Sequence, residues 1–310
     1  MINQPKPNID KTIAITILAR DCEDALMHNI PKIEKLRKCF KSSIVIIVEN
    51  DSKDKTKELL VEWQNNSENV VVISEDYNIQ TIPLQTEDCK MPGSSIHRNE
   101  RMCFYRNKYM EYLSALHFEY DYMIVVDIDI DDFREEGILQ AIVNAPNDWA
   151  ALFANGRFYI KVFQKRILSR YYDWYAFLPD TNPLETTDMD LTLREMRLNS
   201  DIPNTELKKI KYLSCYSAFA GIGIYHYPAI KNLRYQVIPN KRSKYCESIA
   251  DHIYFNISVI NGNSKKNYIA SDILVFYEET SIFRWMIGIF FTAKFIVSVM
   301  EFFTGKRYKE

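Results

Sequence analysis

Four aspartates follow an apolar run near the middle of the chain. The run 123–126 (Met-Ile-Val-Val) leads into Asp127, Asp129, Asp131 and Asp132. Such a run predicts a buried strand that ends where the side chains become polar. Because residues two apart on a strand share a face, Asp127 and Asp129 are expected to point together. Paired like charges favour a cation between them, and a hard divalent ion on oxygen ligands commonly carries phosphates. The motif predicts metal-assisted handling of a diphosphate.

A structural interpretation of the same residues stays open. Acidic residues after a strand often stabilise the start of the next helix, which here begins near Asp132 and includes Glu135 and Glu136. A short Asp-x-Asp motif also recurs by chance. What favours the metal site is the set of polar segments expected around it.

The first half of the chain alternates strand and helix patterns. The expected order is strand, helix, strand, helix, strand, over residues 12–18, 22–40, 43–48, 54–64 and 69–74. This order predicts a parallel sheet with helices on both faces. Right-handed crossovers then bring the carboxyl ends of the strands to one edge, where ligands bind. The polar strand ends expected there are 19–21, 49–51 and 127–132.

A long helix is expected over residues 96–117, directly before the acidic strand. Arg98, Arg101, Arg106 and Asn107 lie in its first half. They fit a solvated basic face, and they also fit guanidinium groups that pair with a diphosphate.

The second half is less regular. A strand is expected over 150–160, a polar and mobile loop over 179–204, and an apolar segment with two glycines over 214–227. Those glycines indicate close approach of a ligand or another backbone, or a plain bulge or tight turn. Residues 246–256 have helical spacing that brings Glu247 near Asp251.

Composition limits the classes of protein that fit. The chain has 310 residues, 47% hydrophobic content and 13% aromatic content, which indicates one large or two small folded domains. Its 39 basic and 41 acidic side chains argue against nucleic-acid binding. Six scattered cysteines predict reduced thiols, and residues 1–11 lack the apolar core of a signal peptide. We expect a protein on the cytosolic side.

Together these segments resemble nucleotide-diphospho-sugar glycosyltransferases of the GT-A fold, and most nearly the capsule-associated mannosyltransferase-like family. The resemblance covers about residues 12–274. It lies in Leu18-Ala-Arg-Asp21, in 48–54, in Arg101 with Arg106-Asn107, in Asp127-Ile-Asp129, in 217–225 and in the segment from Cys246-Glu247 onward. Asp129 with Asp131 has the same Asp-x-Asp spacing, but Asp127 closes the apolar run as in the family pattern. The family often has a histidine soon after the Cys-Glu pair, whereas His252 lies five residues beyond Glu247.

The resemblance implies an α/β, Rossmann-like fold with a mostly parallel sheet flanked by helices. It implies a GT-A domain over 1–278, with a nucleotide-binding half at about 12–132 and an acceptor half at about 133–278. Residues 279–310 would add a C-terminal apolar helix and a basic tail. The implied reaction moves a hexose, such as mannose, from a UDP- or GDP-linked donor to a hydroxyl of a glycan or lipid-linked acceptor. Surface polysaccharide synthesis is the implied setting.

The resemblance also implies roles for individual residues. Asp127 and Asp129 would hold Mn²⁺ or Mg²⁺. Asp129 would act in catalysis through this metal, which would neutralise the negative charge that develops on the leaving diphosphate. His252 is either a third metal ligand or a structural histidine. Glu247 is the candidate base, or else an acid that stabilises a helix start. The residues expected to bind the donor are Ala19, Arg20, Glu49, Asp51, Arg101, Arg106, Asn107 and Asp127.

The segment 282–303 is nearly all apolar and is followed by three basic residues. It is long enough to cross a bilayer, but Lys294 near its middle disfavours that, and its polar residues fall loosely on one side. An in-plane membrane helix with a basic tail is one prediction. A helix docked on the domain or in a homo-oligomer interface is the other.

Two enzyme classes and a binding protein are the alternatives. A sugar nucleotidyltransferase should have a glycine-rich loop after its first strand, and residues 19–23 contain no glycine. A phosphatase-like hydrolase needs its nucleophile directly after that strand, whereas Asp21 comes too late. A non-catalytic glycan-binding protein on the same scaffold also fits.

Overall fold

The β-branched runs of the first half form parallel strands, as predicted. The computed structural model describes residues 9–86, 90–162, 165–262 and 264–304. In its first half, strands and helices alternate along the chain: β1 (Ile9–Ala19), α1 (Glu23–Arg37), β2 (Phe40–Asn50), α2 (Thr56–Asn66), β3 (Val70–Glu75), α3 (Ile96–Ala115) and β4 (Tyr122–Asp127). β1 pairs in parallel with both β2 and β4, and β2 pairs in parallel with β3.

The second half extends the same sheet with strands of both directions. Its elements are β5 (Asp132–Phe133), α4 (Glu135–Val143), β6 (Trp149–Val162), β7 (Lys165–Tyr171), β8 (Leu178–Pro179), α5 (Leu193–Asn199), α6 (Asp201–Glu206), β9 (Tyr212–Ser217), β10 (Ile222–His226), α7 (Tyr227–Ile230), α8 (Asp251–Ile260) and β11 (Lys266–Glu278). β10 runs antiparallel to β4 and β6, while β6 and β11 are parallel.

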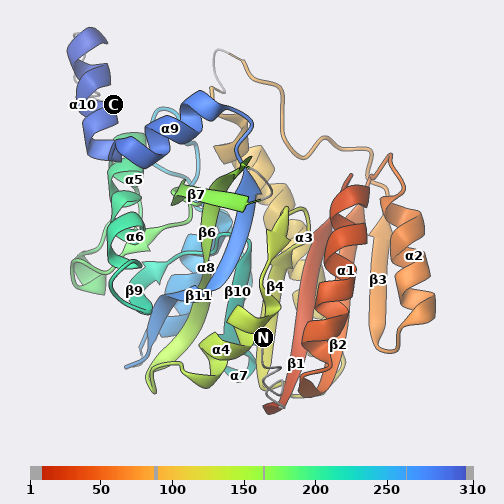
Figure 1. Cartoon of the computed structure of the whole chain (residues 1–310). Helices are drawn as coiled ribbons and strands as arrows, with labels where there is room; N and C mark the ends of the chain where they lie inside the picture. The colour runs from red at the N-terminus through yellow and green to blue at the C-terminus, as the bar shows by residue number, and fades with distance from the viewer. Residues whose placement is uncertain (1–8, 87–89, 163–164, 263, 305–310) are drawn as a thin grey trace.

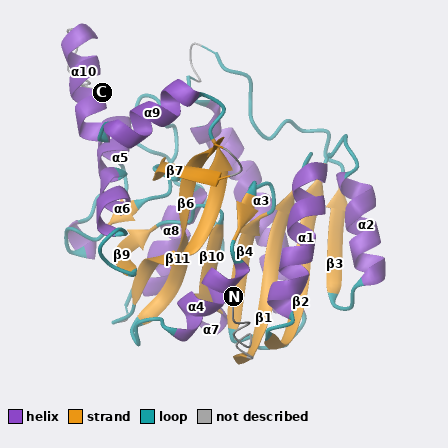
Figure 2. Cartoon of the chain, in the orientation of Figure 1, coloured by secondary structure: helices purple, strands orange, loops and turns teal. Residues whose placement is uncertain are grey.

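One sheet therefore connects the two halves. Within the described residues its main path runs β3-β2-β1-β4-β10-β6-β11-β9-β8. α1 and α4 contact each other on one face, and α3 and α8 contact each other on the opposite face (Figure 1). Figure 2 shows these helices on both sides of the continuous strands. The predicted α/β fold with a helix-flanked, Rossmann-like sheet is confirmed.

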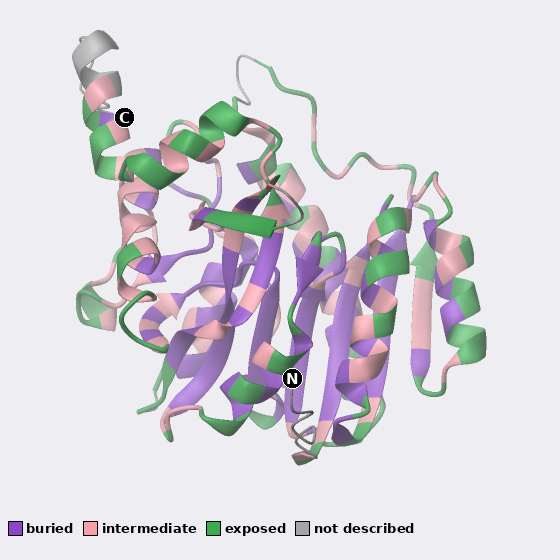
Figure 3. Cartoon of the chain, viewed as in Figure 1, coloured by how far each residue is buried: buried purple, intermediate pink, exposed green. Residues whose placement is uncertain are grey.

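The strands are buried because both of their faces are covered. β1, β2 and β4 contain continuous apolar runs with almost no exposed surface. Figure 3 shows this buried centre, with exposed residues along the outer helices. Such uninterrupted runs are typical of parallel strands covered by helices on both sides.

One expectation for the second half needs correction, and one open alternative is decided. The region 179–204, expected to be a loop, contains the helix α5, which Thr192 and Glu195 start with a reciprocal capping box. That Thr-x-x-Glu pattern is visible in the sequence. In the segment 214–227 a turn at Ala220 and Gly221 separates the strands β9 and β10, in agreement with the tight-turn alternative. Among the described cysteines none forms a disulfide, as expected; Cys89 lies outside the described residues.

The expected C-terminal helix is two helices rather than one. α9 (Ile282–Phe290) and α10 (Ala293–Thr304) follow each other with a bend of 109° measured over Ile282–Phe290 and Ala293–Val299. Asp201 stabilises the start of α10 after the break, because its two carboxylate oxygens accept hydrogen bonds from the amides of Ala293 (2.8 Å) and Lys294 (3.1 Å). A carboxylate in this position satisfies amides that have no partner within the helix.

Membrane crossing by one straight helix is not supported in the described part of the chain. No single helix there is long and apolar enough, although α9 and the start of α10 together reach the required length and composition. α9 lies across β7, where the Trp285 indole donates to the carbonyl of Ile167 at 3.0 Å.

Candidate active site

The acidic motif lies at the carboxyl edge of the parallel strands, as predicted. Asp127 is the last residue of β4, and its Cα is paired with that of Leu18 near the end of β1. Ala19, which ends β1, is paired with Glu49 near the end of β2. Three polar strand ends therefore meet at one rim of the sheet.

Asp127 and Asp129 share a side of the chain although β4 ends between them. Ile128 and Ile130 are completely buried, whereas Asp129 is exposed, so the alternation continues through the turn. Asn29 of α1 fixes this turn, because its amide nitrogen donates to the carbonyl oxygens of Ile128 (3.1 Å) and Ile130 (2.8 Å).

The other acidic residues of the run have partners elsewhere. Asp131 accepts a hydrogen bond from the amide of Glu278. Asp132 is buried and forms ion pairs with Lys32 and Arg166. Asp131 is therefore tied to β11, and Asp127 with Asp129 is the Asp-x-Asp pair whose side chains both border the cavity described below.

The helix-start interpretation applies to two other acids. Glu135 and Glu136 lie in the first turn of α4 and pair with Lys35 of α1. Asp127 and Asp129 take no part in that helix start.

The two motif carboxylates carry little compensating charge. Burial raises the pKa of Asp127 to about 7, although Arg106 opposes the shift. Asp129 is exposed at the rim of a cavity, yet the surrounding protein atoms reduce its solvation enough to raise its pKa as well. The nearest cation is Arg106, whose Nη2 lies 3.4 Å from Asp127 Oδ1. Carboxylates held together without enough positive charge fit a divalent cation, which accepts such oxygens as ligands.

A cavity of about 390 Å³ opens beside these carboxylates. Four predicted site residues line it, namely Ala19, Arg20, Asp127 and Asp129. Arg98, named above for the basic half of the helix before β4, also lines it. Leu18, Asp21 and Asn50 come from the strand ends expected at this edge, and the sequence interpretation assigned no role to the rest, which are Gln80, Thr81, Ile82, Met102 and Tyr105. We call this the first cavity. Its size is within the range of small-ligand pockets.

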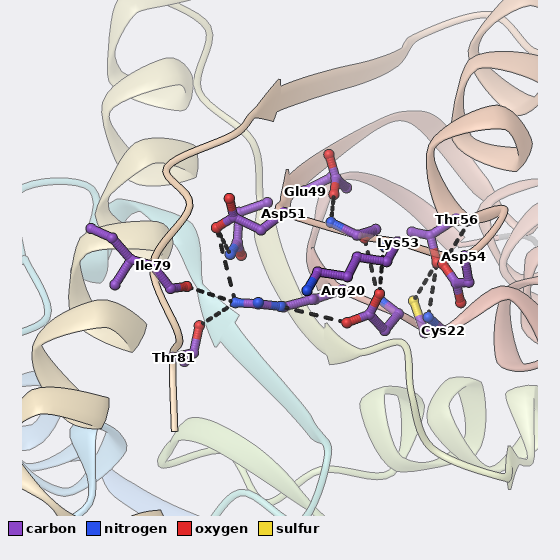
Figure 4. Close-up of polar contacts among 12 residues, drawn as sticks. Arg20, Cys22, Glu49, Asp51, Lys53, Asp54, Thr56, Ile79 and Thr81 are labelled. Atoms are coloured by element: carbon purple, nitrogen blue, oxygen red, sulfur yellow. Dashed lines mark hydrogen bonds and ion pairs between the residues drawn. The ribbon is translucent and has the colours of Figure 1, made fainter. Parts of the chain in front are cut away.

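Arg20 holds a strap of chain, residues 78–82, along this cavity. Its Nη1 donates to Thr81 Oγ1 (2.9 Å) and to the carbonyl of Ile79 (3.2 Å), and lies 3.9 Å from an oxygen of Asp51 (Figure 4). Asp51 in turn accepts from the amide of Asn78 at 2.6 Å. Arg20 and Asp51 therefore shape the pocket by positioning the strap.

The position of Glu49 does not support its predicted role in donor binding. It is completely buried, one carboxylate oxygen accepts from the amide of Ser52 at 2.9 Å, and the other accepts from the hydroxyl of Ser74. Asp51, also expected to face the nucleotide, lines neither cavity described here. The residue between them, Asn50, is the one that faces the first cavity.

Only one side of α3 faces the first cavity, and this determines which of its basic residues line the site. Arg98, Met102 and Tyr105 are spaced by four and three residues and line the first cavity together. Arg101 falls outside this stripe, and its guanidinium lies over the Phe104 ring at 5.9 Å.

Asn107 also lies outside both cavities. Its side chain exchanges two hydrogen bonds with the backbone of Tyr235, at 2.9 and 3.0 Å. The predictions that Arg101 and Asn107 bind the donor are not supported by these positions.

Arg106 forms ion pairs with two acids, Asp127 beside the first cavity and Asp251. It is 2% exposed, and its Nε lies 2.7 Å from Asp251 Oδ2. The same guanidinium reaches Asp127 from the other side. Arg106 therefore orients both acids.

A second cavity of about 270 Å³ adjoins the first and shares Arg98 and Asp127 with it. The rest of its lining mixes aromatic rings with two further acids, Asp173 and Asp251. The sequence pattern had placed Asp251 near Glu247 without a role, and no signal had marked Asp173, which lies between aromatic residues.

Glu247 lines neither of these cavities. One of its carboxylate oxygens accepts from the amide of Ile96, the first residue of α3, at 3.1 Å. An acid near the unpaired amides of a helix N-terminus stabilises the helix. Glu247 therefore has the alternative role given above, an acid at a helix start, but the helix is α3. Its position does not support the predicted role as base.

His252 is buried and lines the second cavity. Its ring stacks on Phe219 with centroids 3.7 Å apart, and neither ring nitrogen has a hydrogen-bond partner in the structure. Burial lowers its pKa to about 3, so the ring is neutral. Within the described residues no three His, Cys, Asp or Glu side chains converge as metal ligands, so the structure gives no support to His252 as a third ligand beside Asp127 and Asp129.

Comparisons with known proteins give a weak likeness to solved structures. No family model matches the chain, and no curated protein matches it. Mannosyltransferase PcManGT from Pyrobaculum calidifontis, in complex with GDP-Man and Mn²⁺, is 8% identical, with a TM-score of 0.48 over 99% of this chain and 68% of that one.

Two further solved structures are similar at the same level. S. aureus TarS 1-349 is 14% identical, with a TM-score of 0.42 over 86% of this chain and 60% of that one. Glucosyl-3-phosphoglycerate synthase from Mycobacterium tuberculosis is 11% identical, with a TM-score of 0.39 over 86% of this chain and 70% of that one. Likeness at these scores does not assign an activity to this chain.

Proposed function

We propose that this protein is a metal-dependent glycosyltransferase of the GT-A type, which moves a sugar from a nucleotide-diphosphate donor to an acceptor hydroxyl. The observation that carries the proposal is the pair Asp127 and Asp129, two acids with raised pKa that border the first cavity at the carboxyl edge of a parallel sheet. This cavity is of ligand size and adjoins a second one. A donor and an acceptor need two such connected spaces.

The donor would occupy the first cavity. Asp127 and Asp129 would hold Mn²⁺ or Mg²⁺, and the bound metal would neutralise the charge that develops on the leaving diphosphate. Arg98, at the border of the two cavities, adds a guanidinium that can pair with phosphate oxygens. Arg20 and the strap 78–82 enclose the other end.

The acceptor would occupy the second cavity. If the reaction inverts the anomeric centre, a carboxylate there must take the proton of the acceptor hydroxyl. Asp173 and Asp251 line that cavity beside Asp127, whereas Glu247 does not. We therefore move the proposed base from Glu247 to one of these two acids.

The donor nucleotide, the transferred sugar and the biological setting are also part of this proposal. A UDP- or GDP-linked donor, transfer of mannose or another hexose and a role in surface polysaccharide synthesis come from the sequence resemblance. We keep them as hypotheses for assays with defined donors.

The test is calorimetric titration of GDP and of UDP into the protein with Mn²⁺. We expect one of them to bind, and Asp129→Asn to weaken binding at least about tenfold because the metal loses a ligand. Asp131→Asn is the matched control, since Asp131 belongs to the same run but bonds to the backbone of β11. Equal binding by wild type and Asp129→Asn would refute the metal site.

Turnover assays separate the alternatives. Release of nucleotide from GDP-mannose or UDP-glucose identifies a transferase. Binding without any release would favour a glycan- or nucleotide-binding protein, and conversion of a nucleoside triphosphate and a sugar phosphate would identify a nucleotidyltransferase.

We also propose that α9 lies on the inner face of a membrane with anionic lipids. Its outer side exposes large apolar residues, including Phe283 (67% exposed) and Phe290 (72%). Exposed cations accompany them at Arg284 and Lys294. An apolar helix face with basic residues suits the interface of an anionic bilayer.

Sedimentation with phosphatidylglycerol-containing vesicles tests this contact. Phe283→Asp with Phe290→Asp should abolish sedimentation, because both side chains are on the exposed face and the Trp285 contact that docks α9 is kept. Leu84→Asp removes an equally exposed apolar residue elsewhere (74% exposed) and should sediment like wild type. Loss in both variants would contradict a specific role for α9.

A further inference from the structure

We propose that the second cavity binds one uncharged sugar ring of the acceptor and that Asp173 is the residue that selects it. This inference rests on the proposed function and names the acceptor class for the same site. It favours a neutral glycan end over an acceptor whose phosphate or carboxylate would enter the cavity.

A single turn positions Asp173 relative to the metal-binding motif. The amide of Ala220 donates to Asp173 Oδ2 at 2.8 Å, and the carbonyl of the next residue, Gly221, accepts from the amide of Asp127 at 2.8 Å. Ala220 and Gly221 both have left-handed backbone angles, with φ of 52° and 91°. Two adjacent residues of this turn thus bond to the two acids, Ala220 to Asp173 and Gly221 to Asp127. The acids therefore lie where donor and acceptor would meet.

Asp173 keeps hydrogen-bonding capacity that its neighbour Asp251 has used on a cation. Its oxygens accept from the amides of Ala176 (3.1 Å) and Ala220 (2.8 Å), and in the described part of the chain no basic side chain pairs with it. Asp251 is instead paired with Arg106 at 2.7 Å. Each oxygen of Asp173 has a lone pair left, so it can accept a hydrogen bond from a sugar hydroxyl.

The charge around Asp173 disfavours an anionic ligand. Burial raises the pKa of Asp173, although the hydrogen bonds from the amides of Ala220 and Ala176 oppose the shift. A phosphate or carboxylate placed beside it would add a like charge in a poorly solvated space. The guanidinium of Arg106 already faces Asp251 and Asp127. Arg98 lies at the border with the first cavity, where the donor diphosphate would use it.

Aromatic rings give the cavity a wall for the apolar face of a sugar. Tyr172 stacks on Tyr277 with centroids 3.5 Å apart and planes within 7°, yet it stays 36% exposed. Trp174 and Phe158 complete this side of the lining. Aromatic walls combined with a few fixed polar groups are typical of small-molecule sites. A volume of about 270 Å³ suits one ring rather than an extended chain.

Saturation-transfer NMR on the full chain, saturated with Mg²⁺ and the nucleoside diphosphate that binds, tests the inference. The probes are the methyl glycosides of mannose, glucose and galactose, with mannose 6-phosphate and methyl glucuronide as anionic counterparts. With the first cavity filled, phosphate binding there does not interfere. We expect at least one neutral glycoside to bind at least tenfold more tightly than either anion.

Two variants and a control assign this preference to the cavity. Asp173→Asn should weaken the neutral glycoside at least tenfold and reduce the discrimination against anions. Tyr172→Ala should weaken the glycoside without changing that discrimination. Asp180→Asn, on the same segment but outside both cavities, should match wild type. Nucleotide affinity should be unchanged in all three, which also shows that each variant is folded.

The outcomes separate this inference from the proposed function. Equal binding of neutral and anionic probes, absence of glycoside binding, or an unaffected Asp173→Asn variant would overturn the inference while nucleotide binding persists. If no nucleoside diphosphate binds to the wild-type protein with metal, the proposed function itself fails.

Discussion

Arg106 is a buried cation that pairs with Asp127, which lines both cavities, and with Asp251, which lines the second. It is 2% exposed, and it pairs with Asp251 at 2.7 Å and with Asp127 at 3.4 Å. Arg106→Met keeps much of the side-chain volume but leaves Asp251 as a buried charge without a partner. Removing one member of a buried ion pair typically costs about 3–5 kcal/mol of stability.

A double-mutant cycle measures the coupling between Arg106 and Asp251. We expect Arg106→Met alone to lower the free energy of unfolding by about 3–5 kcal/mol. Arg106→Met with Asp251→Leu should recover a large part of that loss, because no uncompensated charge remains at position 251. Urea unfolding at pH 7.5, followed by tryptophan fluorescence, gives the four free energies.

The control is an arginine with a similar partner but in solvent. Arg242 pairs with Asp188 at 3.0 Å and with Glu195 at 2.8 Å, and all three side chains are exposed. Arg242→Met should cost no more than about 1 kcal/mol. Additive effects of Arg106→Met and Asp251→Leu, with a coupling energy near zero, would refute the reasoning that the pair acts as a unit.

Two further predictions concern the turn beside Asp127 and the start of β1. Gly221→Ala should lower the free energy of unfolding by about 1–3 kcal/mol, because φ is 91° and a Cβ would lie 2.5 Å from the Tyr277 hydroxyl. The control is Gly93→Ala, where no atom lies within 4 Å of the added Cβ. It should change the free energy of unfolding by no more than about 0.5 kcal/mol in the same urea assay. Similar losses at both glycines would contradict this. Burial acts to raise the pKa of Asp121, but hydrogen bonds from Lys11 and Thr12 outweigh it and leave that pKa lowered. The stabilisation is therefore present above the unfolded pKa of about 3.9 and is lost as the pH falls through the lower folded value. The stability difference between wild type and Asp121→Asn should be present at pH 7 and shrink at pH 3, and an equal difference at both would count against it.

The first half of the fold is largely readable from the sequence. The apolar runs of β1, β2 and β4 and the polar residues that end them predicted both the parallel sheet and the rim where Asp127 lies. Strand periodicity also predicted that Asp127 and Asp129 share a side. These features depend on local patterns that the chain order alone reveals.

Side-chain partners across the fold were not predictable in the same way. Glu49 had the right position for a ligand, but Ser52 and Ser74 use its carboxylate. Glu247 had the right type for a base, but the start of α3 uses it. Whether a carboxylate is available depends on which donors the rest of the fold brings to it.

The sequence by itself determined the strands, their polar ends and the acidic motif, because these follow from periodicity and from where apolar runs stop. The tertiary structure decided the rest. The rotation of α3 against the sheet selected Arg98 and excluded Arg101. The turn at Ala220 and Gly221 holds Asp173 at the second cavity, and Asp201 stabilises the start of α10 where the C-terminal apolar segment bends. Each of these results depends on a contact between residues distant in the chain, and such contacts are fixed by packing and register rather than by local composition.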